Sequence, residues 1–249
     1  GIPGAAVLVV RDGQPVLTRV YGLADVEKEI AVTADTNFRL ASLTKQFTAT
    51  CVLMLVDRGK LSLDRKITDV FADFPEYGRG ISIRNLLQHT SGLIDYEDFV
   101  PEASPVQVSD RGVLDIMRQQ STVYFEPGTQ YRYSNSGYAV LAMMVEEVSG
   151  QSFAKFLHDN IFEPLGMNAT VAHQNGISTV ANRAYGYTVD DSGVSGSDQS
   201  PWSAVLGDGG IYSSLNDLFK WDQALYTERL VPAVLFEQAL TPNLGNYGF

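Results

Sequence analysis

A serine and a lysine three positions apart, Ser42 and Lys45, carry the clearest chemical signal in the sequence. Nucleophilic catalysis by serine needs a placed hydroxyl, a base that takes its proton, and donors for the oxyanion that forms. At the start of a helix the Ser42 backbone N–H is free to donate, and residues i and i+3 share one helix face. A lysine in an apolar setting either loses its proton or finds a partner. The pair therefore predicts a serine nucleophile with a proton-handling neighbour.

The same spacing occurs a second time, at Ser152 and Lys155, so the spacing alone identifies nothing. In the second copy, Ser152 is expected to cap an amphipathic helix and Lys155 to lie on its solvated face. The helix expected at 42–58 differs because apolar residues occupy most of its faces, and Gly59 is expected to end it. Burial of this helix makes Ser42 and Lys45 the stronger candidates.

A partner for Lys45 is expected in the segment that contains Tyr133 and Asn135, which follows a turn and precedes an apolar helix. A phenol is a poor base at neutral pH, but a neighbouring ammonium favours its ionised form. The Asn135 amide can face both Lys45 and a substrate carbonyl. The alternative is that Tyr133 is an aromatic residue at the edge of the core and Asn135 a helix cap.

The three histidines of the chain are His89, His158 and His173. A Ser-His-Asp triad has little support because no G-x-S-x-G turn is present. We expect His89 to brace the loop after a short helix and the other two to lie at the surface. No H-E-x-x-H or P-loop pattern occurs either.

The order of the expected elements indicates an α+β fold. An apolar run at 5–10 is expected to form a buried strand, paired with 15–21 across the turn at Asp12 and Gly13. Residues 246–249 have a strand-like sequence, so we expect the chain to return from helices to strand, with a helical region inserted into a sheet domain. The helices are expected at 42–58, 83–89, 111–119, 137–148, 153–160 and 214–226.

Composition excludes several functions. The chain has 249 residues, 45% of them hydrophobic, and a net charge of −11. No apolar run is long enough to span a bilayer, and scattered basic residues on an acidic chain do not favour nucleic acid. Cys51, the only cysteine, is expected in the core. The chain begins at Gly1 with no signal segment, and we expect both ends to have been cut.

Several ordered segments make the chain resemble the serine β-lactamase and penicillin-binding-protein superfamily. The resemblance is to its class C-like branch, with D-alanyl-D-alanine carboxypeptidases, D-aminopeptidases and family VIII-type esterases. It covers almost the whole chain, and six segments in the order of the family make it specific. These segments lie at 2–7, 38–45, 86–93, 126–138, 164–167 and 209–213.

The resemblance implies a role for each matching position. Ser42 is implied as the nucleophile, with its backbone N–H as half of the oxyanion hole, and Lys45 as its proton-handling neighbour. Tyr133 is implied as the general base and Asn135 as a contact for the amide of the substrate acyl side chain. No metal or organic cofactor is implied. The substrate would be a small molecule or peptidoglycan-like, and the location periplasmic or secreted.

The chain departs from the family in one respect. The third family motif, Lys-Thr-Gly or His-x-Gly on a strand that also supplies the second oxyanion donor, is not found. We therefore expect one β-lactamase-like domain over 1–249, truncated at its C-terminal end, with a sheet part at about 1–40 and 201–249 and a helical part at about 41–200. The missing strands are expected on a longer parent protein, a second chain or another protomer, because a lone hairpin is marginal.

The sequence leaves the function open between three classes. The leading hypothesis is a serine hydrolase acting on an amide, ester or β-lactam through an acyl-enzyme. The alternatives are a non-catalytic binding or scaffold member of the same fold and a penicillin-sensing domain that stays acylated.

Overall fold

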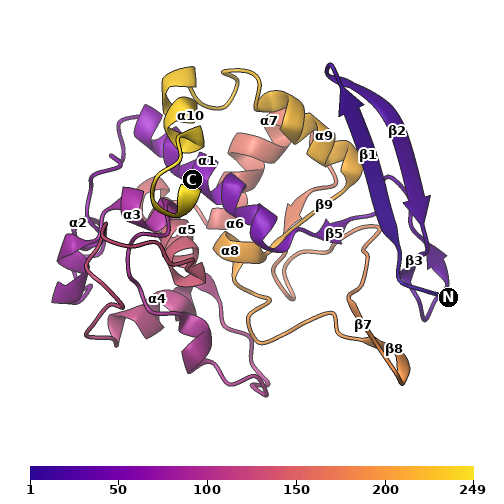
Figure 1. Ribbon diagram of the computed structural model, residues 1–249, viewed down its shortest axis with the longest axis horizontal. Coiled ribbons are helices and arrows are strands. Elements are labelled where there is room, and N and C mark those ends of the chain that lie inside the picture. Colours follow the sequence, from indigo (N-terminus) through magenta and orange to yellow (C-terminus); the bar gives the residue numbers. More distant parts are fainter.

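The computed structural model describes residues 1–249 and shows a helical body with a β-hairpin on one side (Figure 1). The α+β class agrees with the prediction. Helices α1 and α5 occupy the centre, and the shorter helices surround them. The helices are α1 (Lys45–Asp57), α2 (Ile67–Val70), α3 (Ile83–Leu87), α4 (Asp110–Arg118), α5 (Asn135–Ser149), α6 (Phe153–Leu157), α7 (Glu163–Leu165), α8 (Leu206–Gly209), α9 (Leu215–Ala224) and α10 (Ala233–Leu240).

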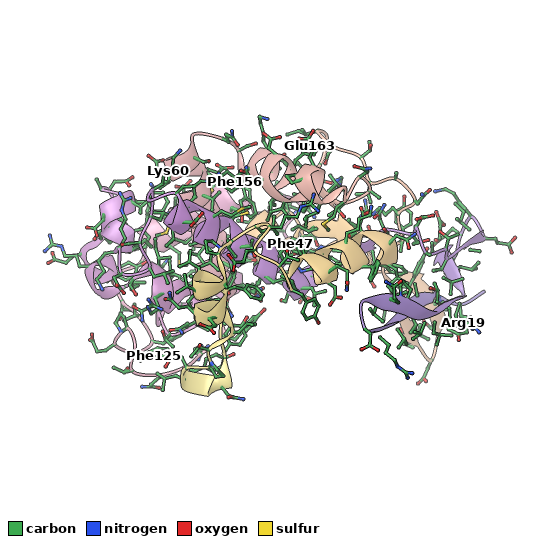
Figure 2. All side chains as sticks on the ribbon, turned by 90° about the horizontal axis from the view of Figure 1, so that it is seen from above. Arg19, Phe47, Lys60, Phe125, Phe156 and Glu163 are labelled. Carbon is green, nitrogen blue, oxygen red and sulfur yellow. The ribbon has the colours of Figure 1, made fainter.

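Helix α1 is buried on nearly every side, as predicted, and Cys51 lies in the core. Its Phe47 ring stacks on Trp221 with 4.1 Å between ring centroids, and Figure 2 places Phe47 in the middle of the molecule. Gly59 follows the helix with φ +67°, the left-handed conformation expected of a C-terminal glycine. The predicted helical start at Ser42 is instead a 3₁₀ turn, η1 (Ala41–Thr44), that leads into α1.

The other long helix of the core, α5, begins after Ser134, whose hydroxyl accepts from the Gly137 N–H at 3.2 Å. It ends at Gly150, with φ +72°. The remaining predicted helices lie within a few residues of the observed ones. The exception is the helix expected at 153–160, which changes after α6 into a π-helical turn, η4 (His158–Phe162).

A small three-stranded sheet supports the segment before Ser42. Its order is β5 (Phe38–Arg39), β9 (Ile211–Ser213) and β6 (Val171–Ala172), all antiparallel. The Leu40 N–H continues the pairing by donating to Ile211 O at 2.8 Å. Residues far apart in the sequence thus fix the chain two residues before the candidate nucleophile.

The N-terminal hairpin, β1 (Ala5–Arg11) and β2 (Gln14–Tyr21), projects from the helical body (Figures 1 and 2). Asp12 and Gly13 have φ +51° and +72°, as a tight two-residue hairpin turn requires. The prediction of a buried strand at 5–10 is wrong: β1 alternates between exposed and half-buried residues, and β2 is exposed throughout. Helix α9 packs on β1, but no strand pairs with the free edge of β1.

Four further strands form two small ribbons. They are β3 (Leu23–Asp25) with β4 (Ile30–Ala31), and β7 (Tyr187–Asp190) with β8 (Gly193–Gly196). Two more 3₁₀ turns, η2 (Glu76–Gly80) and η3 (Tyr96–Phe99), lie in the loops of the helical body.

Residues 201–249, expected in the sheet, contribute one strand, β9, and the helices α8, α9 and α10. The strand predicted at 246–249 is wrong. A 3₁₀ turn, η5 (Leu244–Asn246), occupies part of it, and the Phe249 N–H donates to Ala239 O on α10. The backbone is thus hydrogen-bonded to a helix end rather than to a strand. No helix in the structure has the length and apolar character needed to cross a membrane.

Candidate active site

Ser42 lies in η1, directly after β5, with its side chain exposed. Ala41 before it has φ +47°, a conformation that non-glycine residues rarely adopt. The Ser42 backbone N–H has no hydrogen-bond acceptor within the chain. A strained turn with a free N–H beside an exposed hydroxyl is an arrangement that can hold a reacting carbonyl.

Lys45 is the first residue of α1 and only 3% exposed. Its Nζ donates to three acceptors: Ser42 Oγ at 3.1 Å, Asn135 Oδ1 at 2.8 Å and Asp208 O at 3.0 Å. An ammonium has three donors, so these contacts satisfy all of them. Of the two outcomes expected for a buried lysine, the structure shows the one in which it finds partners.

Tyr133 reaches the same hydroxyl from the loop before α5. Its Oη lies 2.6 Å from Ser42 Oγ, and Lys45 Nζ lies 4.8 Å from the centre of its ring. The Ser42 hydroxyl therefore has a tyrosine and a lysine within hydrogen-bond reach, which is the geometry required of a nucleophile and its base.

His89 braces the Tyr133 loop, in agreement with its expected structural role. The ring is fully buried, its Nδ1 accepts from the Ser134 N–H at 3.1 Å, and its backbone oxygen accepts from the Arg132 N–H at 2.9 Å. It packs on the Tyr133 ring with 4.4 Å between centroids. Burial, with the nearby Lys45 charge, lowers the pKa of His89 to about 3.

This shift predicts acid sensitivity. As pH falls from 6.5 toward about 3, the unfolded chain binds a proton at His89 that the folded chain does not, so stability is lost over that range. One such group contributes a slope of up to about 1.4 kcal/mol per pH unit. His89→Asn removes the imidazole, while asparagine tolerates the φ of +56° and can accept a hydrogen bond.

Denaturant unfolding from about pH 7 to about pH 3 checks this prediction, over the range set by the pKa shift. The free energy of unfolding of the wild type should approach that of His89→Asn as pH falls. His158→Asn, which deletes an exposed imidazole, should not reproduce this convergence. A gap between wild type and His89→Asn that stays constant with pH would contradict the assignment.

Asn135, the first residue of α5, is half-buried and uses both ends of its amide. Its oxygen accepts from Lys45, as expected, but its Nδ2 donates to Glu97 Oε1 at 2.8 Å. Glu97 thus accepts from the amide N–H of Asn135 that the sequence analysis expected to face a substrate carbonyl. Glu97 lies in η3, within the acidic run at 95–98.

Asp208 lies on the other side of Lys45. Its carboxyl is almost fully buried, and Oδ2 accepts from Tyr96 Oη at 2.9 Å. Burial raises the pKa of this carboxyl to about 7, against the opposing effect of the Lys45 charge. The short α8 that carries it is fixed by Asp110, which accepts from the N–H groups of Leu206 and Gly207, each at 2.8 Å.

A cavity of about 200 Å³ opens beside Ser42. Asn135, Glu97, Asp208 and Arg39 contribute to its wall. The sequence predicted Ser42, Lys45, Tyr133 and Asn135, and the structure brings all four together. Glu97 and Asp208 were not predicted from the sequence, although Asp208 directly precedes the Gly209–Gly210 pair that contributed to the family resemblance.

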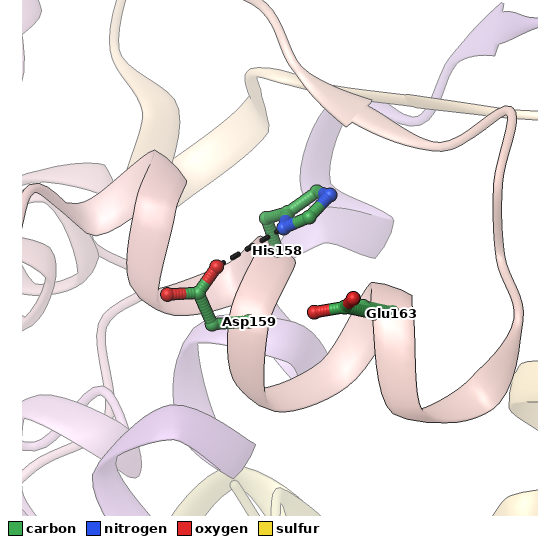
Figure 3. Close-up of side chains that lie close together, drawn as sticks. All are labelled: His158, Asp159 and Glu163. Carbon is green, nitrogen blue, oxygen red and sulfur yellow. Dashed lines mark hydrogen bonds and ion pairs between the residues drawn. The ribbon is translucent and has the colours of Figure 1, made fainter.

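The second serine–lysine pair, Ser152 and Lys155, has the structural role that the sequence predicted. Ser152 caps α6 by accepting from the Lys155 N–H at 3.3 Å, and Lys155 forms a surface ion pair with Asp159. Figure 3 shows Asp159 with His158 and Glu163 on the following turn. These three are possible metal ligands by proximity, but Asp159 is already paired with Lys155 and His158, so they do not form a site prepared for an ion.

The fold and this cluster define a class of α+β proteins in which a serine, in the turn that leads into a central helix, faces a lysine and a tyrosine. The chain belongs to the beta-lactamase family, because the family model described as Beta-lactamase matches residues 1–247. The predicted superfamily is thereby confirmed.

Relatives and solved structures agree with this membership. Penicillin-binding protein 4* of Bacillus subtilis (strain 168) is 33% identical over 256 residues, which cover 97% of this chain and 56% of that protein. D-aminopeptidase of Gluconobacter oxydans (strain 621H) is 31% identical over 245 residues, covering 96% and 45%. The octameric penicillin-binding protein homologue from Pyrococcus abyssi has a TM-score of 0.86 at 28% identity, covering 97% and 56%. The chain spans about half the length of the curated relatives it matches.

Proposed function

We propose that the protein is a serine hydrolase that forms an acyl-enzyme on Ser42 and acts on an amide, ester or β-lactam. One observation carries the proposal: Lys45 Nζ at 3.1 Å and Tyr133 Oη at 2.6 Å both meet Ser42 Oγ. The names of the relatives, a D-aminopeptidase and a penicillin-binding protein, support the same chemistry.

In the proposed reaction, Tyr133 accepts the Ser42 proton as Oγ attacks the substrate carbonyl. The Lys45 ammonium, whose Nζ lies 4.8 Å from the centre of the Tyr133 ring, places a positive charge beside the proposed base. The Ser42 backbone N–H donates to the oxyanion. The proton then passes to the leaving group, the bond between the carbonyl carbon and that group breaks, and water hydrolyses the resulting ester.

We also propose that residues 1–249 act as one hydrolase domain whose sheet is completed by strands outside these residues. The free edge and exposed faces of β1 and β2 support this, since a lone hairpin is marginal in water. Such strands would carry the second oxyanion donor, which is typically worth about 10²–10³ in rate. They would come from further residues of the same protein, a second chain or another protomer, and the octameric homologue makes an oligomer reasonable.

The alternatives within the family are a sensor that stays acylated and a scaffold that never reacts. Single-turnover kinetics of the whole protein with a chromogenic β-lactam and a short-chain nitrophenyl ester separates the three. The proposal predicts a burst followed by steady turnover on at least one substrate. A burst without turnover would identify a sensor, and no burst on either substrate would identify a scaffold.

A further inference from the structure

The segment at 243–247, part of the yellow loop after α10 in Figure 1, is held against the helical body at two of its residues. Asn243 Nδ2 donates to Gln88 Oε1 at 2.7 Å. Gly245, with φ +69°, lies so close to the Tyr131 ring that a Cβ at this position would collide with it. The segment is therefore fixed at two points, and neither contact belongs to the proposed reaction.

Tyr247, at the end of this segment, packs on the ring of His89. The two rings meet edge to face, with 4.7 Å between their centroids. The Tyr247 ring also lies beside Tyr131, with 5.9 Å between centroids. Burial raises the pKa of the Tyr247 phenol, so this ring is uncharged at neutral pH. Tyr133 packs on His89 at 4.4 Å, so His89 is the ring that both the candidate base and Tyr247 contact.

The orientation of the His89 ring depends on this packing. Only one of its two nitrogens is hydrogen-bonded: Nδ1 accepts from the Ser134 N–H at 3.1 Å, and Nε2 is buried without a partner. A ring held by one hydrogen bond can tilt about it, so the close-packed neighbouring rings must fix its plane. Tyr133 depends on His89 in turn, because Tyr133 is 40% exposed and has few other contacts to restrain its ring.

We infer that Tyr247 is a positioning residue: through the His89 ring, it holds Tyr133 at hydrogen-bond distance from the Ser42 hydroxyl. The inference rests on the proposed function, to which it adds a segment distant in the sequence from the nucleophile and its base. The contacts made at positions 243 and 245 fix where Tyr247 lies. A shift of about 1 Å in a reacting group can cost about 10²-fold in rate, so a small movement of the Tyr133 ring suffices.

The alternative role for Tyr247 is direct contact with the substrate. Tyr247 also borders an apolar cavity of about 440 Å³ that reaches Ser42, together with Trp221 and Phe236. A substrate group in that cavity would touch Tyr247 without any involvement of Tyr133. The two roles differ in one measurable respect, because only positioning requires the Tyr133 hydroxyl.

The test follows the reaction of a fluorophosphonate with Ser42 in the whole protein by intact-mass measurement. Tyr247→Ala should lower the second-order rate constant by about 10–100-fold, while Tyr247→Phe, which keeps the ring, should stay within about threefold of the wild type. Gly245→Ala, which forces a Cβ into the Tyr131 ring, should lower the rate constant in the same way as Tyr247→Ala. Thermal unfolding checks that each variant is folded.

A double-mutant cycle separates positioning from substrate contact. If Tyr247 acts through Tyr133, then Tyr247→Ala should change the rate constant by less than about twofold once Tyr133→Phe has removed the hydroxyl. The adduct accumulates irreversibly, so longer incubation measures the slow variants. An undiminished loss from Tyr247→Ala in the Tyr133→Phe protein would overturn the inference, because the effect would then arise from substrate contact or general damage.

Tyr226→Ala is the matched control for loss of a tyrosine. Tyr226 follows α9, is 80% exposed and packs on none of these rings. Its replacement should leave the rate constant within about twofold of the wild type, as expected for a surface substitution.

The failures of the two proposals are distinguishable. A wild type that forms no adduct on Ser42 would overturn the proposed function and the inference with it. A wild type and a Tyr247→Ala variant that react at equal rates would overturn the inference alone. If Tyr133→Phe forms no adduct, the single variants decide: a loss in Tyr247→Ala that Tyr247→Phe restores upholds the inference, and equal losses in both contradict it.

Discussion

Replacing Ser42 by alanine is expected to lower kcat/KM for hydrolysis by about 10⁴–10⁶, since loss of a catalytic serine removes the acyl-enzyme route entirely. The side chain is exposed and caps no helix, so the fold should survive the change. Steady-state kinetics on the best substrate, with thermal unfolding as the check on folding, measures the effect.

The chain contains its own matched control. Ser152 has the same spacing to a lysine but caps α6, so Ser152→Ala should cost about 1 kcal/mol of stability and leave kcat/KM within about twofold of the wild type. Equal activity of Ser42→Ala and wild type would show that hydrolysis, if present, occurs at another residue.

Replacing Lys45 by methionine is expected to lower kcat/KM by about 10²–10⁴, the contribution typical of a positioned proton-transfer group. Methionine keeps much of the side-chain volume but removes the positive charge that lies 4.8 Å from the centre of the Tyr133 ring. It also leaves Asn135 Oδ1 and Asp208 O without their donor, at about 1–3 kcal/mol for each buried group left unpaired.

Lys155→Met is the control for this change. Its ammonium pairs with Asp159 at the surface, where an ion pair is worth about 0–1 kcal/mol, and it should have no effect on kcat/KM. If Lys45→Met kept full activity with an intact fold, the lysine would be a structural residue rather than part of the proton transfer.

The predictable part of the site was the part encoded locally. The apolar residues around Phe47 indicated that α1 is buried, and burial made Lys45 a residue in need of partners. The turn before α5 placed Tyr133 and Asn135 on a fixed loop. These signals act over a few residues, so hydrophobic periodicity and turn chemistry report them.

The missed part depends on contacts between distant segments. Glu97 reaches Asn135 across 38 positions, and Tyr96 reaches Asp208 across 112. No periodic pattern marks either pair, and a carboxylate in an acidic run is ordinarily read as solvated surface. The expected strand at 246–249 failed for a related reason, since strand formation depends on a partner and the backbone there pairs with α10 instead.

For the N-terminal hairpin, the turn was predicted correctly from local sequence, but the predicted burial of its first strand was wrong. Its two-residue turn was predicted from Asp12 and Gly13, and the structure shows that turn between the two antiparallel strands. The burial of a strand cannot be predicted in the same way, because it depends on neighbours that pair with the strand and cover its faces. Only α9 packs on β1, so apolar side chains such as Val7 and Val9 remain over 40% exposed.

The central claim is that Ser42 is a nucleophile activated by Lys45 and Tyr133. Its most direct test is intact-mass and peptide mass spectrometry of the whole protein after reaction with a fluorophosphonate, which forms a phosphorus–oxygen bond to an activated serine and releases fluoride. The account predicts one adduct per chain, on the peptide that contains Ser42, lost in Ser42→Ala and strongly slowed in Lys45→Met. Folded protein of the correct mass that acquires no adduct, or acquires it on Ser152 or another serine, would contradict it.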